Sequence, residues 1–132
     1  MSRRILPILA LAAAAIAWAR CRLVIYEIAE RSMEPALAPG DWMLGLRAPL
    51  RLPTGAVVVY RDPSDPGLEI VKRIAPAPRP LAAGELWLLG DNPDAGSVDS
   101  RTLGPIPREW VAARLVLRYH PGPPHFLRRK DR

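Results

Sequence analysis

The sequence predicts a mainly β fold, with a small antiparallel sheet or partly open barrel behind one N-terminal membrane helix. Three observations support this prediction. A charge-free apolar run occupies residues 5–19, segments rich in β-branched and aromatic residues follow it, and 16 of the 132 residues are proline. Proline disfavours long helices and suits short strands joined by fixed turns. Hydrophobic residues make up 49% of the chain, so a packed core can form.

The apolar run at residues 5–19 is predicted to be a retained membrane anchor. As a helix it would be about 22 Å long, which is short for a hydrocarbon core about 30 Å thick. Arg3 and Arg4 precede it and Arg20 follows it, and such side chains can reach the interface. The alternative is a cleaved signal peptide with Ala17-Trp18-Ala19 as its cleavage site. We favour the anchor, because a charged residue directly after the site is a poor context for cleavage.

Short strands separated by turns are predicted for the rest of the chain. Each predicted strand is rich in β-branched, aromatic or other apolar residues, and turn residues such as proline, glycine and aspartate bound most of them. The segments are 23–30, 42–46, 56–61, 68–74, 85–90 and 114–119. Residues 91–105 are expected to form a long turn-rich connection, and residues 107–113 could form one helical turn.

The chain therefore divides into an anchor at 1–22, a β domain at 23–120, and a basic, proline-rich tail at 121–132. The tail is predicted to be disordered.

The formal net charge of +6 is not distributed as in a nucleic-acid-binding protein. The arginines are scattered, no predicted helix carries a basic stripe, and two basic clusters flank the apolar run. We interpret these clusters as charge at a membrane surface and expect no nucleic-acid partner. Cys21 is the single cysteine, so the sequence predicts neither an internal disulfide nor a zinc cluster, and we expect no metal or cofactor.

Ser32 is a candidate nucleophile in the stretch ERSMEPALAPGDWM. Pro35 and Pro39 stiffen the loop around it. A nucleophilic serine needs a base, and histidine is its usual partner. His120 and His125 are the only histidines, and both lie in or beside the proline-rich tail, which could not hold an imidazole reliably against Ser32.

Lys72 is the other candidate base. Among 19 basic residues only Lys72 and Lys130 are lysine, so the chain keeps a lysine in a predicted strand against its own preference for arginine. An ammonium can lose its proton when desolvated, whereas a guanidinium stays charged. Strand alternation places Lys72 on the same face as Ile70 and Ile74, and burial there would lower its pKa. The alternative interpretation is a lysine that reaches solvent from an edge strand.

Three segments together resemble the signal peptidase I family of serine–lysine proteases. They are SMEP at 32–35 with PGD at 39–41, VKRI at 71–74, and GDNPDAGSVDSR at 90–101. They occur in the family's order, and the resemblance covers about residues 28–119. It implies a β fold of the signal peptidase I type, a single-pass membrane protein with an extracytoplasmic catalytic domain, and a precursor polypeptide as the substrate.

The resemblance also implies roles for individual residues. Ser32 corresponds to the nucleophile, Lys72 to the general base and Ser97 to the serine that orients the lysine. Asp99 and Arg101 correspond to an ion pair that braces the site. The remaining candidates are the turn residues Gly90, Asp91 and Asn92, and Met33 as a substrate contact.

The sequence departs from the family pattern in two informative places. Glu30 stands two residues before Ser32, where many relatives have serine or glycine, and that serine can supply a second oxyanion donor. Only 17 residues separate Lys72 from Gly90, so the large insert of the full bacterial enzymes has no room. This compact form looks most like the nickel-type superoxide dismutase maturation proteases, a branch of the family that removes an N-terminal extension.

We therefore expect a membrane-anchored serine endopeptidase that removes leader or pro-peptides from precursor proteins. Its substrate could be a nickel-type superoxide dismutase precursor, or secreted proteins in general, as for a general signal peptidase. A catalytically silent, membrane-associated peptide-binding β module is the alternative from another class. It would be marked by a broken dyad, whereas both Ser32 and Lys72 are present. A self-cleaving repressor would need a DNA-reading helix pair, which the pattern lacks. The sequence predicts no oligomeric state.

Overall fold

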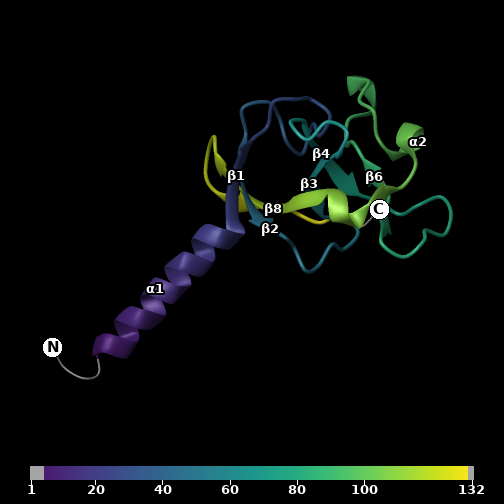
Figure 1. The fold of residues 1–132 in the computed structure, drawn as a ribbon. Coiled ribbons are helices and arrows are strands. Elements are labelled where there is room, and N and C mark those ends of the chain that lie inside the picture. Colours follow the sequence, from purple (N-terminus) through teal and green to yellow (C-terminus); the bar gives the residue numbers. More distant parts are fainter. Residues whose placement is uncertain (1–4, 131–132) are drawn as a thin grey trace.

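The computed structural model describes residues 5–130. One helix, α1 (Ile5–Arg22), projects from a β domain that contains the rest of these residues (Figure 1). None of its residues is buried. At about 1.5 Å per residue its 18 residues span about 27 Å, and its mean hydropathy of 1.6 is high enough for a membrane span. Arg3 and Arg4, which precede the predicted membrane anchor, lie outside the described residues.

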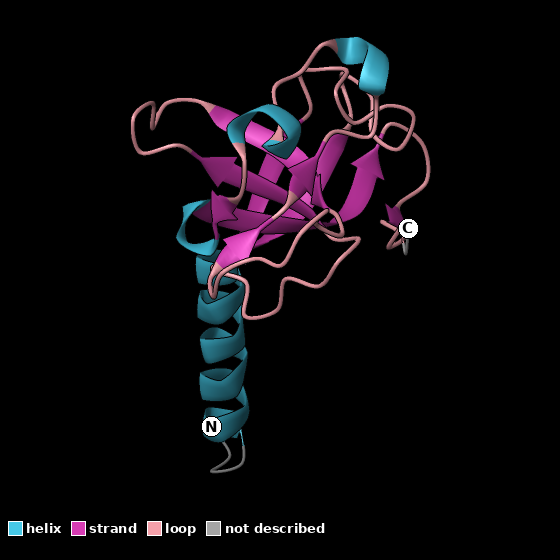
Figure 2. Ribbon diagram, turned by 90° about the vertical axis from the view of Figure 1, so that its right-hand side faces the viewer, coloured by secondary structure: helices cyan, strands magenta, loops and turns pink. Residues whose placement is uncertain are grey.

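The β domain is built on one antiparallel sheet, as predicted. Within residues 5–130, seven strands form this sheet in the order β1-β2-β8-β3-β4-β6, with β9 paired to β8. Figure 2 shows these strands crossing at an angle to one another, as in a twisted sheet, above α1. Their bounds are β1 Leu23–Glu27, β2 Trp42–Arg47, β3 Val57–Arg61, β4 Glu69–Ile74, β6 Leu88–Leu89, β8 Val111–His120 and β9 His125–Phe126. A second, two-stranded sheet pairs β5 (Glu85–Leu86) with β7 (Ile106–Pro107).

Strand β3 is covered on both faces, and this explains its unbroken apolar sequence. Val57 and Val59 belong to one buried cluster, with Met33 and Leu115 among its members. Val58 belongs to a second cluster on the opposite face of the strand. The full second cluster is Ala56, Val58, Tyr60, Ile74, Leu88 and Ile106. The sheet therefore has a small buried core on each side of β3, and neither face of this strand is exposed to solvent before its last residue.

Four predicted elements differ from the structure. The predicted strand 23–30 ends earlier, because β1 stops at Glu27. Residues 85–90 do not form one strand, because Glu85–Leu86 pairs with β7 while Leu88–Leu89 pairs with β4. Only Arg108–Trp110 of the predicted helical turn is helical, in a 3-10 turn (η2), and Val111 already begins β8. Strand β8 is longer than predicted because β2 and β3 pair with its two edges.

The connection after β6 contains two short capped helices. A 3-10 turn, η1 (Pro93–Ala95), is capped by Asn92, whose side chain accepts from the backbone N–H of Asp94. Helix α2 (Ser100–Leu103) is capped in the same way by Asp99. Such caps satisfy backbone donors that a helix start leaves free. They therefore give shape to a segment whose composition predicted only turns.

The C-terminal segment lies against the sheet, in contrast to the disordered tail expected from the sequence. Strand β3 pairs with β8 only as far as Leu115, so the same edge of β8 is free to pair with β9 at Leu117 and Arg118. The backbone N–H of Leu127 then donates to Val116, and the Leu127 side chain packs on the first buried cluster. Charge and proline content gave no sign of this edge pairing. The last basic residue, Arg132, lies outside the described residues.

The turn before β3 provides a test of this packing. Gly55 and Gly40 both have left-handed backbones, with φ of +89° and +91°. A Cβ at Gly55 would lie 2.7 Å from the backbone oxygen of Lys130, whereas a Cβ at Gly40 meets nothing within 4 Å. Both Gly→Ala changes should lose about 1–2 kcal/mol from backbone strain, and Gly55→Ala should lose more because of the clash.

The measurement is denaturant unfolding of both variants, each with and without residues 127–132. Truncation should abolish the extra loss of Gly55→Ala and leave Gly40→Ala unchanged. Equal losses for the two variants in the full chain would show that the C-terminal segment does not pack on Gly55.

Candidate active site

Ser32 lies in the loop between β1 and β2, and the connection after β6 holds this loop in place. The backbone N–H of Asn92 donates to the carbonyl of Ser32 (2.9 Å), and the Asn92 side-chain amide donates to the carbonyl of Arg31 (3.0 Å). Ser32 is 5% exposed. Its hydroxyl forms no hydrogen bond with any group of residues 5–130.

Lys72 is placed on β4 with its side chain inside the domain. It is 1% exposed and pairs in register with the buried Val58 of β3, with Ile70 and Ile74 two residues away on its own strand. Its Nζ lies 3.0 Å from the Oγ of Ser97, to which it donates a hydrogen bond. Burial lowers the pKa of Lys72, because desolvation disfavours the ammonium.

Two nearby carboxylates oppose this lowering. Asp99 and, more weakly, Glu30 raise the pKa of Lys72, while the Arg101 guanidinium lowers it further. The net pKa remains below the ordinary value of 10.5. The amine of Lys72 is therefore easier to deprotonate than that of a solvated lysine.

Gly90 marks the point at which three chain segments meet. A Cβ at this position would lie 2.9 Å from the carbonyl oxygen of Ser32, 3.1 Å from the Oγ of Ser97 and 3.6 Å from the Nζ of Lys72. The space left by the missing side chain thus lets the loop of Ser32, strand β4 and the loop of Ser97 approach each other. Here glycine is needed for close approach rather than for a left-handed backbone.

Asp99 stabilises the backbone at Gly90 through a hydrogen bond. Its carboxylate, 2% exposed, accepts from the backbone N–H of Gly90 (3.0 Å) and from the Nη2 of Arg101 (2.6 Å). Burial alone would raise the pKa of Asp99, but the hydrogen bonds from Arg101 and Gly90 lower it overall. The hydroxyl of Ser100 accepts from the backbone of Leu88, so Ser97 is the serine that faces the lysine.

Arg73 is a structural member of the site that sequence reasoning missed. It forms a buried, two-pronged ion pair with Asp91, with Nη2–Oδ2 at 2.7 Å and Nε–Oδ1 at 2.9 Å. Its Nη1 also donates to the carbonyl of Gly55. Because Arg73 directly follows Lys72, this pair ties strand β4 to the turn after β6. The one available signal was that both residues stand in segments that carry the resemblance, Arg73 in VKRI and Asp91 in GDNPDAGSVDSR.

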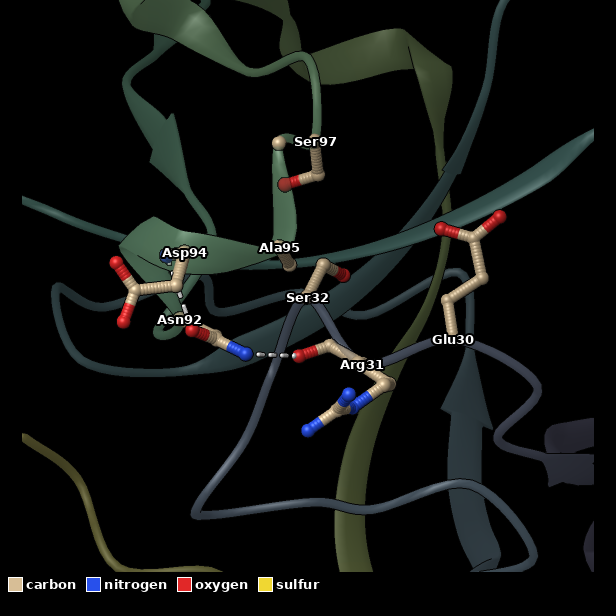
Figure 3. Close-up of a pocket in the computed structure, with 8 residues that line it drawn as sticks. Glu30, Arg31, Ser32, Asn92, Asp94, Ala95 and Ser97 are labelled. Carbon is tan, nitrogen blue, oxygen red and sulfur yellow. Dashed lines mark hydrogen bonds between the residues drawn. The ribbon is translucent and has the colours of Figure 1, made fainter.

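Two cavities open around Ser32. One, of about 340 Å³, is lined largely by apolar side chains, among them the otherwise buried Met33. The other, of about 560 Å³, is polar and is shown in Figure 3. Both are lined by Glu30, Ser32 and Ser97, whereas His120 and His125 line neither. Residues 5–130 contain no group of three or more histidine, cysteine, aspartate or glutamate side chains placed to hold a metal ion.

Comparison with known proteins adds a family to this geometry. The family model described as signal peptidase, peptidase S26, matches residues 1–78, which include Ser32 and Lys72. The chain is 35% identical over 87 residues to the mitochondrial inner membrane protease subunit 1 of Schizosaccharomyces pombe, covering 55% of this chain and 54% of the relative.

Two further relatives have related names. Identity is 28% over 116 residues to the mitochondrial inner membrane protease subunit 2 of Saccharomyces cerevisiae, covering 70% of this chain and 65% of the relative. It is 31% over 109 residues to subunit 1 of Xenopus tropicalis, covering 68% of this chain and 65% of the relative. The chain thus spans between about half and two thirds of the length of these curated relatives.

The burial of Lys72 predicts a stability effect with a definite sign. Its folded-state pKa is below 10.5, so between that lowered pKa and 10.5 the unfolded chain binds more protons than the folded chain. The free energy of unfolding should therefore rise with pH across this window. Lys72→Met removes the cost of burying the ammonium. The variant should therefore be more stable than the wild type at neutral pH, by about 1–4 kcal/mol.

Denaturant unfolding of the whole chain in detergent, between pH 6 and 10, measures this difference, with Lys130→Met as a control for the loss of a lysine. The stability gain of Lys72→Met should shrink towards pH 10. A Lys72→Met protein that is less stable than the wild type at every pH would contradict the burial of a disfavoured ammonium.

Proposed function

The chain belongs to the signal peptidase, or peptidase S26, family, and from this premise we propose that it is a membrane-anchored serine endopeptidase with Ser32 as nucleophile and Lys72 as general base. The observation that carries the proposal is the buried amine of Lys72, held 3.0 Å from Ser97 in the cavity that Ser32 also lines. A buried, uncharged amine is the form in which lysine can accept a proton near neutral pH.

In the first step, the Oγ of Ser32 attacks the carbonyl carbon of the scissile peptide bond, and its proton passes to the Nζ of Lys72. A hydrogen bond donated by the neutral amine to Ser97 leaves the nitrogen lone pair free for this proton. The negative charge that develops on the substrate oxygen needs hydrogen-bond donors. The backbone N–H of Ser32 is a candidate, since it forms no hydrogen bond within residues 5–130.

Collapse of the tetrahedral intermediate breaks the C–N bond. The Lys72 ammonium returns its proton to the leaving amine, which departs as the new N-terminus of the product. The acyl group stays on Ser32 until water attacks it and Lys72 takes the proton of the water. The bond between the acyl carbon and the Oγ of Ser32 then breaks, and Lys72 returns the proton to this Oγ. Glu30 occupies the position from which a serine could supply a second oxyanion donor, and an ionised carboxylate can only accept. In this mechanism a second donor has to come from elsewhere.

The substrate in this proposal is a precursor polypeptide from which an N-terminal segment is removed. The apolar cavity beside Ser32, with Met33 in its wall, suits side chains of an extended peptide. The relatives are named as subunits of a mitochondrial inner membrane protease, which supports a protease that acts at a membrane. A nickel-type superoxide dismutase precursor is a narrower version of the proposal, and it rests only on the short connection between Lys72 and Gly90.

We place the protease domain beside the membrane, with α1 as a single-pass anchor. The helix has the length and composition of a span, and it runs directly into β1 at Leu23. An extracytoplasmic domain is the orientation that the family resemblance implies. Because basic residues stand on both sides of the helix, the positive-inside rule favours neither orientation in the membrane.

The dyad is tested with two variants of the full chain in detergent or lipid vesicles. Precursor polypeptides are incubated with wild type, Ser32→Ala and Lys72→Arg, and new N-termini are identified by mass spectrometry. Ser32→Ala should abolish cleavage, because no nucleophile remains. Lys72→Arg should also abolish it, although charge is retained, because a guanidinium cannot act as a base.

The pH–rate profile of the wild type completes the test, and its activity should rise as the Lys72 amine deprotonates. Substantial turnover by Lys72→Arg would place the base elsewhere. If no precursor is cleaved by the wild type under any condition while peptides still bind to it, the silent peptide-binding module becomes the better account.

A further inference from the structure

The polar cavity beside Ser32 carries negative charge that the hydrolytic mechanism does not use. Glu30 and Asp94 are both exposed on its wall, and neither carboxylate forms an ion pair or hydrogen bond within residues 5–130. Among residues 5–130, Arg31 is the one basic side chain that lines the cavity, and its Nε donates a hydrogen bond to Glu34 at 3.1 Å. Within residues 5–130, the cavity therefore has two carboxylates that no cation pairs with directly.

The position of these carboxylates relative to Ser32 links them to the substrate. Figure 3 shows Glu30 on one side of Ser32 and Asp94 on the other, beyond Asn92. The hydroxyl of Ser32, in a residue only 5% exposed, has no hydrogen-bond partner and opens onto both the polar and the apolar cavity. A peptide with its scissile carbonyl at Ser32 would therefore lie beside both cavities, and the polar cavity is large enough to take one of its side chains.

We propose that this polar cavity is a subsite that selects an arginine or lysine of the precursor next to the scissile bond, with Glu30 as the main specificity-determining residue and Asp94 as its second carboxylate. The proposal rests on the proposed function and names the substrate class of the same site. A basic side chain is the partner that two unpaired carboxylates favour, since charge-assisted hydrogen bonds are the strongest of their kind.

Glu30 has the larger part because it lines both cavities, whereas Asp94 lines only the polar one. Glu30 is also the position at which the sequence departs from the family pattern. The Glu30 carboxylate cannot serve there as an oxyanion donor, but it can attract a positively charged side chain of the substrate next to the scissile bond. Because both carboxylates are partly solvated, the discrimination should be moderate, about five- to twentyfold in kcat/KM.

The test uses one cleaved precursor sequence in which each position near the scissile bond is changed in turn to arginine, glutamine or glutamate. The wild type should prefer arginine to glutamine at one position by about five- to twentyfold in kcat/KM. Glu30→Gln should remove most of this preference and Asp94→Asn part of it. Glu30→Lys should turn the preference towards glutamate. Glu109→Gln makes the same charge change at an exposed position that lines neither cavity, so it should keep the wild-type preference.

Three outcomes would overturn the inference. Equal rates for arginine and glutamine at every position would remove the subsite while leaving the protease mechanism intact. A preference that persists in a Glu30→Gln, Asp94→Asn double variant would place the basic-residue site elsewhere. If the wild type cleaves no peptide of the set and no other precursor, the proposed function fails and the inference fails with it.

Discussion

The burial of one amine organises the site around Ser32. Lys72 is almost fully buried on β4, and its Nζ has a single hydrogen-bond partner within the described residues, the hydroxyl of Ser97. An ammonium in this position is disfavoured by desolvation, so its pKa is lowered. In the proposed mechanism, the same burial that lowers stability makes the amine usable as a base, so the proposed function and the stability of the fold oppose each other at this residue. The apolar clusters on the two faces of β3 pack against the neighbouring β4, with Ile74 in one cluster and Val71 against the other.

The proposed dyad requires Ser32 and Lys72 to keep their places around the cavity that both line, and several polar contacts hold the surrounding segments together. Asn92 binds the backbone on the Ser32 loop, Arg73 and Asp91 lock β4 to the turn after β6, and Asp99 fixes the backbone at Gly90. These ties join segments that are far apart in sequence, and they meet where a single Cβ would not fit. Removing one tie would therefore shift the relative positions of Ser32, Lys72 and Ser97 rather than any one of them alone.

Local sequence predicted the parts of this arrangement that depend on side-chain type and period. The strands around Trp42, Val58 and Lys72 correspond to β2, β3 and β4, and the unusual lysine pointed to the buried position. Long-range pairing was not predictable. The division of residues 85–90 depends on which partner strand each half meets, and the order of the C-terminal segment depends on a free edge of β8. The Arg73–Asp91 pair joins residues 18 positions apart, which no periodicity reveals.

Nuclear magnetic resonance can measure directly whether the folded chain holds Lys72 with a lowered pKa. The sequence contains only two lysines, so in a Lys130→Arg variant labelled with isotopic lysine every lysine signal belongs to Lys72. The measurement is the titration of the Lys72 side-chain resonances in the folded protein and in the same chain unfolded by urea. The account predicts a midpoint below the ordinary value of 10.5 in the folded state, and a return to that value on unfolding. A folded-state midpoint at or above 10.5 would contradict it, because such a lysine could not serve as the base for Ser32.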